Sequence, residues 1–184
     1  MATQDFARFV ASQQNTTDDA VNADWDEIRS EWLDHLDDLH KKVIAFLQEF
    51  VANGSIRYSF KETTLNEEHL GSYRVKTMEI NIGRQHVFLE PVGALLIGCL
   101  GRVDVVGSAG RAQLLLVNEN ARSAADLFKV TVAEGTKKSV FPALSHPIKP
   151  GSLVWKIASR ETRVRFVELD QASFFSLLME VAGA

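Results

Sequence analysis

A stretch punctuated by glycine, residues 82–117, limits what this chain can fold into more than any other feature. It carries six of the eleven glycines, and these separate apolar runs rich in β-branched residues. Such punctuation is typical of β-strands joined by tight turns. We therefore expect the centre of the chain to form antiparallel strands, with hairpin turns at Gly83-Arg84 and at residues 107–110.

One polar pair interrupts this otherwise apolar stretch. Arg102 and Asp104 are two residues apart, so in a strand their side chains share a face. With a turn at residues 107–110, Asp104 lies opposite Gln113. We expect one polar patch around a single carboxylate, formed by Arg102, Asp104, Arg111 and Gln113. Such a patch is either a ligand site or a carboxylate held by its strand neighbours.

A stripe of apolar residues predicts a long helix from about Ala23 to Ala52. Its members recur every three or four residues, which places them on one helix face: Trp25, Ile28, Trp32, Leu36, Leu39, Val43, Phe46 and Phe50. Asn53-Gly54 ends the helix, because glycine is the preferred left-handed stop. Two interpretations stay open for the stripe of the 23–52 helix: it packs on the chain's own sheet, or it forms a homodimer with a second copy.

The other face of this helix is acidic at Asp34, Asp37 and Asp38. The spacing predicts ion pairs four residues apart, from Asp37 to Lys41 and from Asp38 to Lys42. The acidic face is either simply solvated or is the surface that meets a basic protein partner.

Two histidines, His35 and His40, lie in the same segment. They are five residues apart and do not share a helix face, so the spacing of a helical metal pair is absent. We expect both to belong to the solvated face.

The remaining elements follow from alternation and turn residues. Strands are predicted at residues 55–61, 73–82, 85–90, 111–117, 127–133, 153–158 and 163–169. Residues 95–100 and 102–106 form either one bent strand or two short ones. A phase change near Thr77 predicts a bulge, and Pro91 ends its strand or places it at an edge. Residues 62–72 and 134–151 are predicted to be long connections. Short helices are expected at 4–13, before a turn at 15–20, and at 171–181, where Asp170 is the cap.

This order of elements predicts a single α+β domain over residues 1–184. A long N-terminal helix packs on a mostly antiparallel sheet of about seven to eight strands, and a short C-terminal helix closes the fold. Residues 1–20 form a loosely packed N-terminal arm in this interpretation.

Charge and cysteine content exclude several classes of function. The net charge of −4 argues against a general nucleic-acid binder. The single cysteine, Cys99, excludes an intramolecular disulfide and a cysteine zinc cluster. No signal-peptide or membrane-spanning pattern is found, so we expect a cytoplasmic protein. The sequence indicates no cofactor and no metal.

The sharpest catalytic alternative is a divalent-metal nuclease of the restriction-endonuclease type, or a degenerate relative. Asp104 would supply the first carboxylate and Glu90 a second. The next strand reads Gln113-Leu114-Leu115 and lacks the Glu-x-Lys that such a site needs.

Three hypotheses about function follow from the sequence, and whether the protein is an enzyme stays open. The favoured one is a non-enzymatic interaction module, such as an immunity or antitoxin-like inhibitor or an accessory subunit. The second is the nuclease. The third is a small-ligand domain in which the loop at 134–151 acts as a lid.

Overall fold

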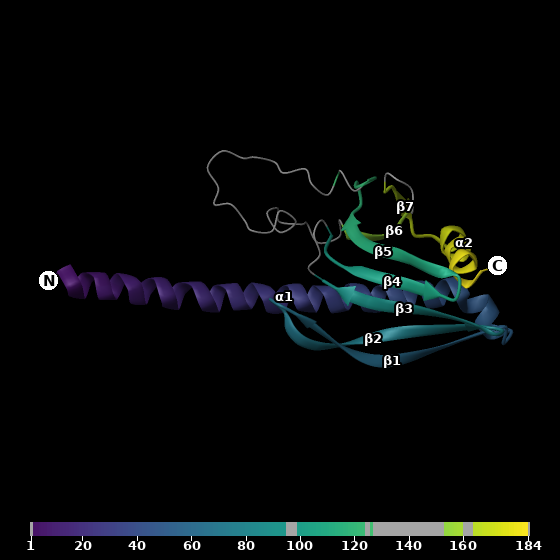
Figure 1. The fold of residues 1–184 in the computed structure, drawn as a ribbon, viewed down its shortest axis with the longest axis horizontal. Coiled ribbons are helices and arrows are strands. Elements are labelled where there is room, and N and C mark those ends of the chain that lie inside the picture. Colours follow the sequence, from purple (N-terminus) through teal and green to yellow (C-terminus); the bar gives the residue numbers. More distant parts are fainter. Residues whose placement is uncertain (1, 95–98, 124–125, 127–152, 160–163, 184) are drawn as a thin grey trace.

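The computed structural model describes residues 2–94, 99–123, 126, 153–159 and 164–183, with side chains from residue 25 onward. It has the predicted α+β fold (Figure 1). Helix α1 spans Ala2–Ala52 and helix α2 spans Gln171–Ala182. Seven strands lie between them in the described part of the chain: β1 (Ile56–Glu67), β2 (Gly71–Ile82), β3 (Gln85–Gly93), β4 (Arg102–Gly107), β5 (Gly110–Asn118), β6 (Leu153–Ala158) and β7 (Phe166–Glu168).

The strands form one antiparallel sheet in which each strand pairs with the next in the sequence. Two hairpins match their predicted register. Ile82 pairs with Gln85 across a two-residue turn, and Gly83 there has a φ of +61°. In β4 and β5, Asp104 pairs with Gln113 as the turn at residues 107–110 predicts. Short local turns thus determine the register of the middle of the sheet.

Both helices pack on one face of the sheet, and they touch each other there. Ring pairs join the end of α1 to α2, with centroids 5.9 Å apart for Phe46 and Phe174 and 5.6 Å for Phe50 and Phe175. The apolar stripe of α1 enters this main core, so the intramolecular interpretation of the stripe is the one observed. Its most buried members are Trp32, Leu36, Leu39 and Val43. In the last turns of the helix, Leu47 is buried, although it was not predicted in the stripe, and Phe50 is exposed.

Two glycines of the punctuated stretch let the helices approach the sheet. A Cβ on Gly101 would lie 2.1 Å from a ring carbon of Trp32 in α1. A Cβ on Gly107 would lie 2.3 Å from the carbonyl oxygen of Val181 in α2. Neither distance is compatible with a side chain, so these positions need glycine for close packing as well as for turns.

The other face of the sheet carries a second, smaller apolar cluster. Its buried members are Cys99, Leu115, Val117, Ala121 and Ala158. Side chains alternate along a strand, so Leu115 and Val117 point away from the helices while Leu114 and Leu116 enter the main core. Strand β5 is therefore buried on both faces, which explains its unbroken apolar run.

Helix α1 is longer than predicted. It runs without interruption through residues 4–20, where a short helix and a polar turn were expected, so that prediction was wrong. No glycine or proline occurs between residues 2 and 52. The Asn, Thr and Asp residues there cost a helix at most about 0.7 kcal/mol each relative to Ala, which is too little to stop it.

The β1–β2 hairpin corrects two further predictions. Residues 62–67 belong to β1 and residues 71–72 to β2, so most of the expected polar connection is paired strand. The register runs without a bulge from Ile56–Ile82 to Glu67–Gly71. Burial nevertheless changes phase at Thr77, as the sequence indicates. Pairing of β2 with β3 stops at Met78, and the remaining two-stranded ribbon is free to twist more strongly.

Other boundaries differ less. Strand β3 continues two residues past Pro91, with a register shift between Pro91 and Gly93. Strand β7 covers only Phe166–Glu168 of the predicted 163–169. Helix α2 and its Asp170 cap are confirmed. The strand predicted at 127–133 and the loop at 134–151 lie outside the described residues, as does most of the strand predicted at 95–100.

Candidate functional site

The predicted polar patch comes together around the carboxylate of Asp104. This side chain is only 3% exposed. Arg102 donates to it in a bidentate arrangement, from Nε to Oδ1 at 2.6 Å and from Nη2 to Oδ2 at 2.9 Å. Nη1 of Arg111 lies 3.2 Å from Oδ2. Gln113 completes the patch as the residue opposite Asp104 in the register.

This geometry describes a carboxylate that is already neutralised. Both oxygens of Asp104 face guanidinium groups, and the hydrogen bond to Asp104 raises the pKa of Arg102. A divalent cation would have to displace two arginines to reach it. Fork-shaped Arg–carboxylate pairs are among the strongest side-chain hydrogen bonds. The arrangement therefore fits a clamp that holds β4 and β5 together better than a reactive centre.

The second residue of the nuclease hypothesis lies close by. Glu90 of β3 is the direct register partner of Asp104, so the two acidic residues share one sheet face. No third metal ligand joins them: within the described residues, no group of three His, Cys, Asp or Glu side chains could hold a metal ion. In this cluster, the arginines neutralise the charge of Asp104.

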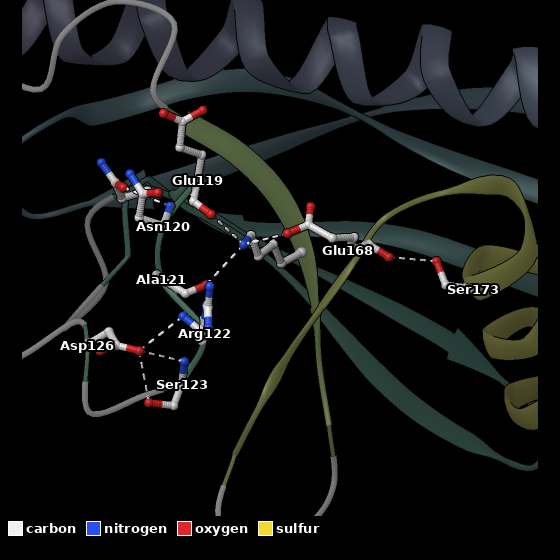
Figure 2. Close-up of polar contacts among 10 residues, drawn as sticks. Glu119, Asn120, Ala121, Arg122, Ser123, Asp126, Glu168 and Ser173 are labelled. Atoms are coloured by element: carbon white, nitrogen blue, oxygen red, sulfur yellow. Dashed lines mark hydrogen bonds and ion pairs between the residues drawn. The ribbon is translucent and has the colours of Figure 1, made fainter.

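A second buried charge lies on the same sheet face, at Lys156 in β6. Figure 2 shows its surroundings, with Glu119, Ala121 and Glu168 labelled. The side chain of Lys156 is 3% exposed. The ammonium group donates to the carbonyl oxygens of Glu119 at 2.7 Å and Ala121 at 3.0 Å, and its Nζ lies 2.6 Å from a carboxylate oxygen of Glu168. Lys156 thus ties the turn after β5 to β6 and β7. The sequence did not predict the burial of Lys156, because a single lysine in a strand normally indicates a face exposed to solvent.

The turn that Lys156 holds has its own polar support, which Figure 2 also shows. The carboxylate of Asp126 accepts hydrogen bonds from the backbone of Arg122 and from the backbone and hydroxyl of Ser123, at 3.0–3.1 Å. Asn118 accepts from the backbone of Asn120 at 3.0 Å. These contacts fix the direction of the chain where it leaves β5.

The acidic residues of α1 lie on its exposed side, as predicted, but with different partners. Asp38 pairs with Lys41 at 2.8 Å, and this contact lowers the pKa of Asp38. Asp37 lies 3.8 Å from Lys76 of β2. The expected pairs four residues apart are therefore wrong. Spacing of three is equally favourable on a helix surface, and β2 brings a competing ammonium to Asp37.

His40 is the largest departure from the sequence prediction at a candidate site. We expected it on the solvated face, yet it is only 4% exposed. Both ring nitrogens are buried without a hydrogen-bond partner, and an unsatisfied buried polar group costs about 1–3 kcal/mol. Burial lowers the pKa of His40. The spacing contained the signal, because His40 lies four residues after Leu36 and three before Val43, both of which are buried.

Comparison with known proteins identifies no relative: no family model, curated protein or solved structure matches the chain. None of the helices within the described residues is both long enough and apolar enough to pass through a membrane. The geometry must therefore carry the functional argument alone.

Proposed function

We propose that the protein is a non-enzymatic interaction module that binds a basic protein surface through α1. The observation that carries this proposal is the length of α1 relative to the sheet. A helix of 51 residues is about 77 Å long, whereas the longest strands have 12 residues and span about 40 Å. In Figure 1 the N-terminal part of α1 continues well beyond the sheet. A helix that leaves its own core is available to a partner.

The charge of α1 supports the choice of a basic partner. Residues 18–38 contain nine Asp or Glu residues and one basic residue, Arg29. Asp34, Asp37 and Asp38 belong to this segment and are exposed. An acidic helix steers basic surfaces toward it and repels acidic ones, which gives specificity and speed of association. An inhibitor or accessory subunit of the kind predicted from the sequence would use such a surface.

The proposal is tested by charge reversal on the helix. Replacing Asp34, Asp37 and Asp38 by lysine should remove a basic protein that co-purifies with the native chain from its own cells. The control reverses Glu68, Glu119 and Glu180, three exposed acidic residues outside α1, for the same change in net charge.

The captured partner must then bind the purified protein directly, with an affinity that falls as salt rises. The proposal is overturned if both triple variants bind equally, or if the direct interaction does not depend on salt. Light scattering of the native protein tests the homodimer predicted through the 23–52 helix. A dimer that survives reversal of the acidic face would assign the helix to self-association instead.

A further inference from the structure

A small pocket, lined by apolar side chains as well as charged ones, lies between α1 and the β1–β2 hairpin, on the sheet face opposite the Asp104 cluster. Its volume is about 190 Å³. At roughly 30 Å³ for each water-sized group, it holds about six of them, which suits a small metabolite. His40 lines this pocket, and its ring packs edge-on against Phe60 with the centroids 5.1 Å apart. Neither ring nitrogen has a partner in the protein.

The rim of the pocket carries both signs of charge. Asp37 and Glu62 supply two carboxylates, and Arg74 and Lys76 supply two cations. The rim pairs are loose, at 3.8 Å between Asp37 and Lys76 and 3.5 Å between Glu62 and Arg74. Charge-assisted hydrogen bonds are normally about 2.7–2.9 Å long. The rim groups are also more than half exposed, so they retain donors and acceptors for a ligand.

The base of the pocket complements this rim. The lowered pKa of His40 keeps its imidazole neutral near pH 7, so it offers one N–H donor and one acceptor. A polar atom of a ligand that reaches the ring would give a partner to one of the two nitrogens that the fold leaves without partners. A cation alone would meet two positive rim groups, and an anion alone would meet two negative ones.

We infer that this pocket binds a small zwitterion of free amino-acid type. Its carboxylate lies on Arg74 and Lys76, its ammonium group on Asp37 and Glu62, and a polar atom of the ligand meets the ring of His40. Arg74 is suited to the carboxylate because a guanidinium fork matches its two oxygens. This site shares Asp37 with the acidic face of α1, but its test needs only the purified chain and changes no residue of that face.

The experiment follows the His40 ring nitrogens by NMR in the full-length ¹⁵N-labelled protein. Their signals are assigned by their loss in His40→Leu. Each common amino acid is added at millimolar concentration, followed by its N-acetyl derivative and by the matching amine without the carboxylate. At least one amino acid should shift the His40 signals saturably. Its N-acetyl derivative and the matching amine should each bind at least about tenfold more weakly.

The variant Arg74→Gln should weaken binding of that amino acid at least about tenfold. Arg57→Gln, an exposed arginine of β1 outside the pocket, should leave the affinity unchanged. The inference is overturned if no amino acid gives a saturable shift, because the pocket then holds water only. It also fails if binding survives Arg74→Gln, or if either analogue binds as well as the amino acid.

Discussion

Lys156 and His40 are both buried and titratable, and they lie on opposite faces of the sheet. They differ in hydrogen bonding, because Lys156 is fully bonded and His40 is not. Lys156 contacts two carbonyl oxygens and a carboxylate within 3.0 Å. His40 has no partner for either ring nitrogen. The first side chain holds the fold together, whereas the second costs stability. Stability alone accounts for Lys156 but not for His40, so His40 is the side chain that calls for a functional explanation.

The two sheet faces differ in the same way, in how completely their polar side chains are bonded. On the face away from α1, the carboxylate of Asp104 is held by Arg102 and Arg111, and Lys156 is fully bonded. On the α1 face, the polar groups near His40 form only long, exposed ion pairs. Buried charges are stable when every lone pair and proton is used. Substitutions that remove a partner should therefore be costly on the first face and mild on the second.

The largest effect is expected from Lys156→Met. The change keeps the length of the side chain but leaves the carbonyl oxygens of Glu119 and Ala121 without their donor. At about 1–3 kcal/mol for each unsatisfied acceptor, we expect a loss of about 3 kcal/mol, measured by urea denaturation. The control is Glu168→Gln, which should cost less than about 1 kcal/mol because Glu168 is 69% exposed. Equal losses for both variants would contradict the role of Lys156 as the donor that satisfies these two carbonyl oxygens.

Asp104→Asn should come next. It removes the charge from the bidentate pair with Arg102 but keeps the size of the side chain. Hydrogen bonds to charged groups contribute about 1.5–3 kcal/mol, so we expect a loss of about 2 kcal/mol in the free energy of unfolding. Asp37→Asn is the matched control and should cost about 0.5 kcal/mol at most, because its ion pair is exposed. If Asp37→Asn costs as much, the two faces do not differ.

His40→Leu should be close to neutral or stabilising by up to about 1 kcal/mol. Leucine removes two unsatisfied nitrogens at similar volume and has the higher helix propensity. Thermal unfolding of the purified variant measures the effect. His35→Leu, on the same helix but only partly buried, is the control for helix propensity alone. A destabilised His40→Leu protein would mean that the ring has a structural role after all.

The pH dependence gives the finest test. Because burial lowers the pKa of His40 in the folded protein, the unfolded chain binds the extra proton more readily. The contribution of His40 is therefore fully present above its unfolded pKa of about 6.5 and is lost as pH falls toward the folded pKa. The native protein should lose more stability than His40→Leu over this range. Parallel curves would show that His40 has the same pKa in the folded and the unfolded protein, and therefore that its ring is not buried in solution.

Local patterns in the sequence predicted part of this fold well. The β4–β5 hairpin follows from a short turn and side-chain alternation, and with it the meeting of Asp104 with Arg111. The α2 cap follows from Asp170, whose carboxylate accepts a hydrogen bond from the backbone of Ser173 three residues later. In each case the partners are neighbours in sequence, so short-range geometry is sufficient.

Prediction failed where the outcome depended on what packs from elsewhere in the chain. The sequence of the β1–β2 hairpin is polar because most of β1 is exposed to solvent. Backbone pairing nevertheless continues to the end of the hairpin, at Glu67 and Gly71. Asp37 found Lys76 of β2 in place of Lys41 because the hairpin lies beside the helix. The continuation of helix α1 through residues 4–20 is a different case, since the polar residues there were misjudged as a turn although none of them stops a helix.

The sequence alone determined the strands around the glycines, the apolar stripe of α1 and the polar patch of β4 and β5, because these depend on periodicity and short turns. Tertiary structure decided that Gly101 and Gly107 make room for the two helices, that Lys156 is a buried tie and that His40 lies over a pocket. Burial is set by the elements that pack against a residue, and these are distant in the chain.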